Sequence, residues 1–591
     1  MRILRLSVVA TNLSLLFVTG LQSQTTQAPI AGSPNESPTI SVTTRLVQVN
    51  VLAHNHHGDP VADLTKNDFE IKDQGKIQPI SLFSVESVKT VNGSQAAQKV
   101  QEMPRNEVSN RMDRMSNSPT SATVILYDIA NTKIHDQMYA RQQMIKFLHQ
   151  VQPEDRIALY ELTQRGFKVI HDFTNNAGSL VAALATAKPG YQYQVESTNP
   201  APSNSGDDNL DNFLDQSNIA TANFFQRNLI INTCLSLKVL ANHLAGIPGR
   251  KNVIWVSGGF PISIGFGDPQ DTYEPSGPSA GISHSGSMGI DAELFSDYIR
   301  EASEAMNTAN VAVYPVDARG LLTPPLMDAS KSVKFNPRNP QQMTAMNRVD
   351  QRNMDTMRYI ADLTGGKAFT DTNDINGAIR KAIDDSQVTY LLGYYVSDDR
   401  WDNKFHHIKV SCKRPGVGIR TKKGYFAQEQ TPPNALEVQR TLHDAVWSPL
   451  DSTTIGILAR ITPSPSVPNA SRILFRVNPS ELRFSQADGR YKDSIDVLFV
   501  QQTRNGKPLV NEKQTMDLAI LPQNYQKLLQ TGLVPGKDLT IDPGTEAIRI
   551  IVLDRNNGAT GSVTVPVTAL DKSGPTVAAA PPANPPAKLP Q

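Results

Sequence analysis

Short continuous apolar runs alternate with amphipathic stretches between about residues 120 and 386. The runs Val124–Tyr127, Val253–Val256 and Val311–Val316 have the length and composition of strands buried on both faces. Amphipathic patterns between them predict helices, among them one from about Asp136, with Met138, Met144, Ile145, Leu148 and Val151 on its apolar stripe, and one at Phe224–Leu244. Strands that alternate with helices predict an α/β fold with a doubly wound, mostly parallel sheet.

Polar residues directly follow each of the three buried runs. Asp128, Ser257 and Asp317 stand at these positions. The carboxyl ends of parallel strands meet at one edge of a sheet, and open α/β sheets bind ligands beyond that edge. We therefore expect a binding surface there, extended by inserts near 190–218 and 262–290.

In the flanking regions apolar and polar residues alternate with a period of two, which is typical of half-buried strands. Residues 43–52 alternate, and short strands continue to about Glu86. Strands predicted within 387–428 could pair back onto this unit. Beyond Pro432 and Pro433, regularly spaced short strands separated by Gly, Pro and Asn predict a β-sandwich.

The predicted organisation has eight segments. They are a signal peptide (1–23), a linker (24–38), an N-terminal β unit (39–88), a second linker (89–119), an α/β domain (120–386), a β extension (387–428), a C-terminal β-sandwich (436–572) and a Pro/Ala-rich tail (573–591).

The composition bears on the location of the protein, on nucleic-acid binding and on disulfide bonds. Arg2 and Arg5 precede the apolar stretch Leu6–Val18, which predicts export to a periplasm or the exterior, with no transmembrane segment beyond the signal peptide. Lys and Arg number 57 against 56 Asp and Glu, so there is no basic surplus for nucleic acid. The only cysteines, Cys234 and Cys412, are expected to stay unpaired.

A set of motifs resembles the bacterial VWFA-related family of exported acidobacterial proteins, whose domain is von Willebrand factor A-like. The resemblance spans about residues 40–428. The motifs that carry it are Leu64–Phe69, Val124–Thr132, Asp155–Leu159, Asp172–Thr174, Gly249–Trp255, Val313–Gly320, Thr364–Gly366, Leu392–Tyr395, Arg414–Val417 and Lys423–Phe426.

The resemblance implies protein binding through a metal-ion-dependent adhesion site, built on a D-x-S-x-S loop, a distant Thr and a later Asp. The corresponding loop here is Asp128-Ile129-Ala130-Asn131-Thr132, in which Ala130 supplies no oxygen. Ser257 stands where the later Asp is expected, and Thr233 lies near the place of the distant Thr. Since Mg²⁺ requires about six oxygen ligands, we expect a degenerate site, with no cofactor or with weakly bound Mg²⁺, Mn²⁺ or Ca²⁺. In the simpler interpretation Asp128 hydrogen-bonds the loop backbone.

These expectations favour an exported, adhesion-like module that binds another protein and is not an enzyme. The partner would contact Asp128, Asn131, Thr132, Lys133, Ser257 and Phe260. A cell-envelope scaffold is the first alternative. A haloacid-dehalogenase-type phosphatase is weaker, because Ala130 replaces its second acid.

Two smaller clusters receive structural interpretations. His54, His56 and His57 precede a turn and are expected in a solvated hairpin. Asp207, Asp208 and Asp211 are expected in a flexible acidic loop.

Overall fold

A five-stranded sheet is the centre of the described structure. The computed structural model describes residues 45–87, 107–111, 122–153, 155–191, 205–259, 285–321, 354–385, 387–396, 401–428, 431–468, 470–503 and 508–569. The strands lie in the order β10-β9-β6-β7-β8, and all are parallel except β8, which is antiparallel to β7. They are β6 (Ala122–Asp128), β7 (Ile157–Thr163), β8 (Gly166–Thr174), β9 (Lys251–Ser257) and β10 (Val311–Asp317). The three buried runs thus lie side by side, as the sequence predicts.

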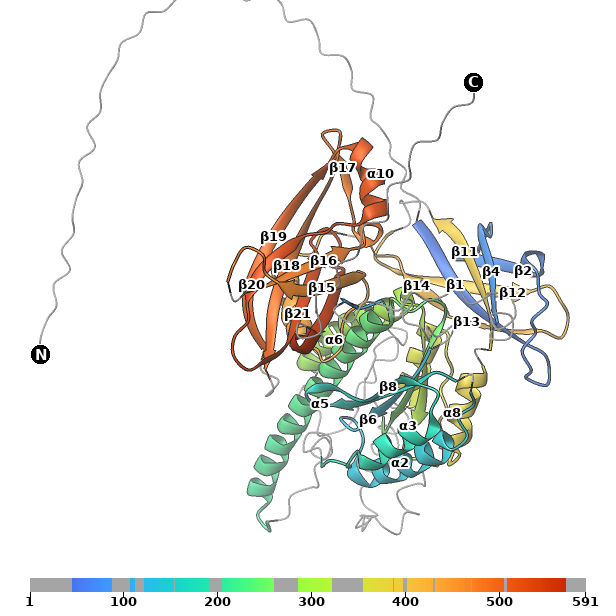
Figure 1. Cartoon of the computed structure of the whole chain (residues 1–591). Helices are drawn as coiled ribbons and strands as arrows, with labels where there is room; N and C mark the ends of the chain where they lie inside the picture. The colour runs from blue at the N-terminus through green and yellow to red at the C-terminus, as the bar shows by residue number, and fades with distance from the viewer. Residues whose placement is uncertain are drawn as a thin grey trace, which may run out of the picture. The chain divides into compact units, whose positions relative to one another are not determined.

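Helices cover both faces of this sheet, which explains why every residue of β6, β9 and β10 is buried. One hydrophobic cluster joins the sheet to α5 (Asp208–Leu244) and α6 (Ser285–Thr308). The other joins it to α2 (Ile134–Leu148), α3 (Ala177–Thr186) and α8 (Ile375–Asp384). Figure 1 shows the two helical layers on opposite sides of the strands.

Two helices differ from expectation. α5 begins at Asp208, so the cluster Asp207, Asp208 and Asp211 belongs to a helix start rather than a flexible loop. The Asp207 side chain caps it by accepting hydrogen bonds from the N–H groups of Asn209 and Leu210. On α2, Met144 and Leu148 are buried as predicted, but Met138 is 56% exposed.

The N-terminal strands and those after residue 387 form one β module. β1 (Arg45–His54) pairs with β11 (Val388–Val396) and β13 (Gly418–Thr421), and β2 (Phe69–Asp73) pairs with β12 (Phe405–Cys412). With β3 (Lys76–Gln78), β4 (Leu82–Ser87) and β14 (Gly424–Phe426) they make two four-stranded sheets around a shared core. The α/β domain is therefore an insertion between strands of this module.

The C-terminal module consists of two antiparallel sheets that share a hydrophobic core. Helix α9 (Ala435–Trp447) covers the outer side of β18 and β21. The strands and remaining helices are β15 (Ile457–Pro463), β16 (Ala470–Val477), η4 (Pro479–Glu481), β17 (Ser485–Ala487), β18 (Arg490–Thr503), β19 (Pro508–Ile520), α10 (Pro522–Thr531), β20 (Gly536–Thr540), β21 (Thr545–Asp554), β22 (Thr560–Pro566) and η5 (Val567–Ala569).

Part of the predicted second linker belongs to this C-terminal module. Glu107–Ser109 forms β5, which pairs with β15. The buried Asn110 side chain donates to the carbonyls of Ser452 and Ile455 and accepts from the N–H of Ile457. The main-chain pairing of β5 and the hydrogen bonds of Asn110 hold residues 107–110 in place, although this segment has few apolar residues.

A buried polar cluster joins the β module to the α/β domain. Asp385, the residue that ends α8, forms an ion pair with Arg420 of β13 and contacts His54 Nε2 of β1 at 3.3 Å. It also accepts a hydrogen bond from the Tyr314 hydroxyl at 2.8 Å. Burial lowers the pKa of His54, and the charge of Arg420 adds to this effect, so the charged partner of Asp385 at neutral pH is Arg420.

The C-terminal module holds a pair of buried acids, Asp493 and Asp554. Asp493 Oδ1 accepts from the N–H of Ser494 and from Asn556 Nδ2, while Asp554 accepts from the N–H groups of Arg483 and Asn556. Burial, with the adjacent Asp554 charge, raises the pKa of Asp493 to about 7.

We predict that this pair makes the stability of the protein fall as pH rises from about 4 through about 7. Because the pKa of Asp493 is raised, the folded state keeps a proton that the unfolded chain releases near the ordinary pKa of an aspartate. The stabilisation from this proton is therefore complete only at acid pH and is lost as the pH rises through about 7. Asp493→Asn should match the wild type near pH 4 and exceed its free energy of unfolding at pH 8 by about 2–4 kcal/mol. Denaturant unfolding at several pH values measures this difference, with exposed Asp542→Asn as the control. A difference that does not vary with pH would contradict it.

Candidate functional site

The carboxyl edge of the sheet brings together most of the residues that the sequence singles out. Asp128 pairs in register with Ser257, and Ser257 with Asp317, so the three residues form a row across β6, β9 and β10. The chain continues from β6 to its neighbour β7 on one side of the sheet, and from β9 to its neighbour β10 on the opposite side. The row therefore lies at the point where the strand order reverses, the usual place for a ligand in such sheets.

The Asp128 carboxylate is fully buried and accepts hydrogen bonds on both oxygens. Asp128 Oδ1 accepts from the Asn131 N–H at 3.0 Å, and Oδ2 accepts from Trp255 Nε1 at 2.9 Å and Ser257 Oγ at 2.8 Å. Asn131 Nδ2 lies within hydrogen-bond distance of both oxygens and of Thr233 Oγ1. Burial raises the pKa of Asp128, and these hydrogen bonds oppose the rise.

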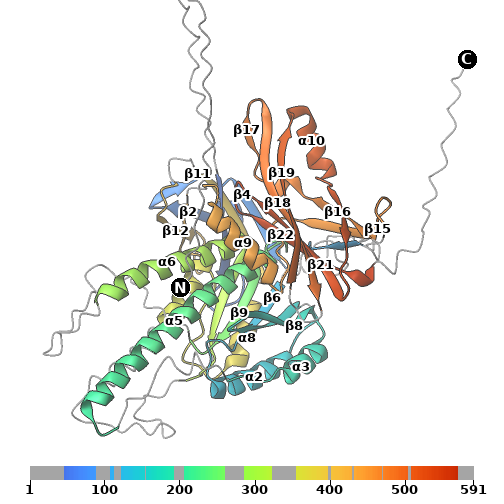
Figure 2. The ribbon, with the colours of Figure 1, turned by 90° about the vertical axis from the view of Figure 1, so that its left-hand side faces the viewer.

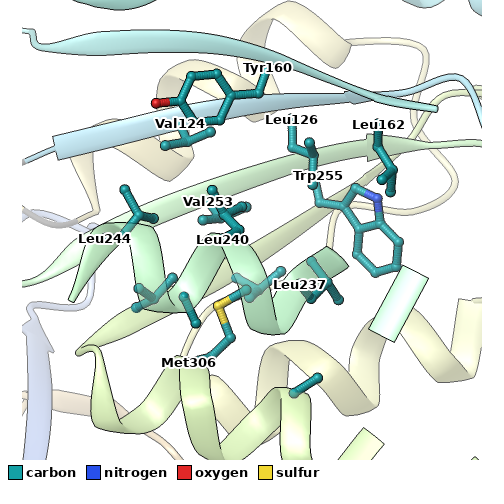
Figure 3. Packing of buried hydrophobic residues seen from close by; sticks show 14 of the residues in the cluster. Val124, Leu126, Tyr160, Leu162, Leu237, Leu240, Leu244, Val253, Trp255 and Met306 are labelled. Carbon is teal, nitrogen blue, oxygen red and sulfur yellow. The ribbon is translucent and has the colours of Figure 1, made fainter. Parts of the chain in front are cut away.

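The Trp255 indole is the member of this cluster that sequence reasoning missed. Its ring packs among Leu126, Leu162 and Leu237 on the face covered by α5, as Figure 3 shows. An indole N–H in such surroundings needs an acceptor, and Asp128 is within reach. The only signal in the sequence was a tryptophan in a strand next to the one that carries Asp128.

Hydrogen bonds also hold the loop between β6 and α2. Thr132 Oγ1 donates to the carbonyl of Asp128 and accepts from the N–H of Gly258. Gln137, fully buried in the first turn of α2, donates to the carbonyls of Ile129 and Thr132 and exchanges two hydrogen bonds with Gly190. The loop is thus fixed by its own side chains.

The residues present do not fit the oxygen shell that a divalent cation requires. The indole and amide N–H groups directed at Asp128 occupy the oxygens that a cation would take. The hydroxyls of Thr132 and Ser257 are likewise used within the cluster, and Ala130 has none to offer. Within the described residues no group of three or more His, Cys, Asp or Glu could hold a metal ion.

The prediction that these residues contact a partner directly needs correction. Asp128, Thr132 and Ser257 have no exposed surface, Asn131 is 5% exposed and Thr233 2%. They pack inward because the carboxylate is satisfied by donors from the sheet and its own loop. Of the predicted contact residues, Lys133 alone is partly exposed, and Phe260 lies outside the described residues.

Among the described residues, four exposed apolar side chains lie near this edge. The rim patch, as we call it, comprises Ile134 (37% exposed), Met138 (56%), Tyr191 (65%) and Leu321 (57%). Gln137 binds Gly190, the neighbour of Tyr191, and Asn373 accepts from both the Tyr139 hydroxyl and the Leu321 N–H. These contacts place Tyr191 and Leu321 near the first turns of α2, which carries Ile134 and Met138.

Asp317, the third residue of the row, is neutralised locally. Arg319 Nε and Nη2 bind its two carboxylate oxygens at 2.9 and 2.8 Å. Asp317 is fully buried, so this pair fixes the turn after β10 and neutralises the Asp317 carboxylate.

Elsewhere in the described structure, no helix is both long and apolar enough to cross a membrane. Cys234 and Cys412 are free. The predicted signal peptide, the linker 24–38 and the tail 573–591 lie outside the described residues.

No family model matches the sequence, and no curated protein matches it. Three solved structures with some similarity have 10–12% sequence identity. An aerotolerance-related membrane protein from Bacteroides fragilis has a TM-score of 0.22, with 44% of this chain and 98% of that chain covered. The VWA domain of SpRpn10 has a TM-score of 0.14 (33% and 88% covered), and the pilus adhesin SpaC from Lactobacillus rhamnosus GG has 0.23 (75% and 53%). These scores are too low to carry an argument, so the description of the fold rests on the strand order and the helical layers themselves.

Proposed function

We propose that the chain is an exported protein-binding module that recognises its partner through the rim patch, without a bound cation. The carrying observation is that four exposed apolar side chains lie near the edge where open α/β sheets bind ligands. In this proposal Asp128 does not contact the partner. It fixes the conformation of the β6–α2 loop, which leads into the helix that carries part of the rim patch.

The local chemistry supports binding over catalysis. The buried acids of the row, Asp128 and Asp317, are engaged by hydrogen-bond donors or by an arginine, and neither faces the surface. An apolar patch with Lys133 at its margin suits a partner surface with apolar side chains and an acidic group.

A cell-envelope scaffold remains the second candidate, supported by contacts between the α/β domain and the C-terminal module. Thr453 Oγ1 donates to the carbonyl of His243 and accepts from the N–H of Gly246, and His243 Nδ1 lies 2.7 Å from the carbonyl of Asp451. In that function the α/β domain would position the β modules, and changes in the rim patch would have no effect on partner capture.

A site-specific photo-cross-linker distinguishes the two candidates. Placed at Met138 in the full chain, in cells of the source organism, it should give a discrete adduct with another exported protein. The same group at Leu436, which is 55% exposed on α9, is the matched control. Leu321→Asp should reduce the Met138 adduct at least tenfold, because a charge would be buried in an apolar contact, and a chelator should leave it unchanged.

Two results would contradict the proposal. Equal adducts from positions 138 and 436 would remove the rim patch as the binding surface. Loss of the adduct in chelator, with recovery in Mg²⁺, would show that a cation is required after all.

A further inference from the structure

The first half of helix α5 carries an exposed apolar face that the described residues of its domain do not cover. Leu210, Phe213, Leu214 and Phe224 are 47%, 68%, 36% and 60% exposed. In Figures 1 and 2 this half of the helix extends beyond the strands of the sheet.

This face points away from the direction of the core. Leu237, Leu240 and Leu244 in the second half face the sheet and are buried. At about 100° per residue, the exposed apolar residues of the first half lie roughly 180° from that buried stripe. A helix that only extended the core would continue the same stripe, so the reversal indicates a second partner.

We propose that this face, residues 210–225 of α5, binds the same face of a second copy of this chain in an antiparallel helix pair. A two-fold axis between positions 218 and 219 would bring Phe213 of one copy against Phe224 of the other. The small residues Ser217, Ala220 and Thr221 lie between these two positions along the helix, so two backbones can approach closely at the centre.

Charge favours the antiparallel arrangement. Asp207 and Asp211 lie at the start of the helix, and residues 205–226 contain no Lys or Arg, whereas Arg227 follows directly. A parallel pair would place the acidic starts together. An antiparallel pair separates the two acidic starts and brings each to the level of residue 227 of the other copy.

The available area suits a modest dimer. The exposed parts of the four apolar side chains amount to about 400 Å² per copy, taking roughly 150–250 Å² for each large side chain. Both copies together would bury about 800 Å² from these residues alone, and their flanks would bring the total near the lower end of specific interfaces.

The test is the mass of the full mature chain in solution, measured by sedimentation over a range of concentrations into the tens of micromolar. The wild type should form a dimer, and Phe213→Asp should shift the equilibrium at least tenfold toward monomer. Leu321→Asp in the rim patch is the matched control and should still dimerise, which keeps this test separate from that of the proposed function.

Three outcomes would overturn the proposal. The first is a wild type that stays monomeric at every concentration. The second is a dimer whose stability does not change with Phe213→Asp or Phe224→Asp. The third is a photo-cross-linker at Leu210 that forms an adduct only with a different protein. Unchanged circular dichroism of the variants excludes misfolding as the cause of a shift.

Discussion

Replacing Asp385 with alanine is expected to lower the free energy of unfolding by about 3–5 kcal/mol, because it leaves the partly buried Arg420 guanidinium without its counter-charge. The Arg420 side chain is 27% exposed and that of Asp385 12%, so solvent compensates little for the loss. Burial, together with the Arg250 charge, already lowers the pKa of Arg420. The Tyr314 hydroxyl would lose its acceptor as well.

Asp384→Ala is the matched control for this prediction. Asp384 precedes Asp385 on α8 and pairs with Arg380 at 2.7 Å, but its side chain is 44% exposed. The expected loss is below about 1 kcal/mol. Denaturant unfolding followed by tryptophan fluorescence measures both variants, and equal losses would show that the cluster does not join the two modules.

Asp128→Ala should be similarly costly, at about 3–5 kcal/mol. The change would leave the Trp255 indole N–H, the Ser257 hydroxyl and the main-chain N–H of Asn131 buried without an acceptor, and each orphaned group costs about 1–3 kcal/mol. If Asp128 were instead mainly a cation ligand, the variant would retain its stability and lose a response to Mg²⁺.

The control for Asp128 is a titration of wild type and variant with Mg²⁺, Mn²⁺ and Ca²⁺. We expect the melting temperature of the wild type to change by less than about 1 °C, since a ligand that does not bind the folded state cannot stabilise it. A rise of several degrees that Asp128→Ala abolishes would restore the metal-dependent interpretation.

The central sheet could be predicted because its signal is strong and local. Runs such as Val124–Tyr127 are apolar on both faces, which only burial beneath two helical layers explains. The row of Asp128, Ser257 and Asp317 then followed from the geometry of parallel strands. The direction of the Asp128 carboxylate did not follow, because it depends on a tryptophan donor from the neighbouring strand.

The sequence analysis missed β5, the first half of α5 and α9. β5 is a three-residue strand whose partner lies about 350 residues away, so no local pattern marks it. The first half of α5 lacks the core-facing stripe and was assigned to a polar insert, although Asp207 followed by Leu210 and Leu214 is a helix start. Helix α9 carried clear signals, a capping box of Asn434 and Glu437 and apolar residues Val438, Leu442 and Val446, in a region dominated by strands.

Met138 belongs to the rim patch, although the sequence pattern predicts it in the core. Its place near the start of α2 suggested core packing, yet its side chain is exposed beside Ile134. A methionine at a surface is flexible and polarisable, properties that suit adaptable binding.

The insertion of the α/β domain between paired strands also constrains biosynthesis. β1 to β4 are complete by Ser87, but β11 to β14 extend to Phe426, so the second half of the module is complete roughly 340 residues after the first. At about 5–20 residues per second, the ribosome needs tens of seconds to supply them. During that interval the early strands have unpaired edges, which are prone to aggregate. A nascent chain of this kind would benefit from a chaperone that shields residues 45–87 until the later strands emerge.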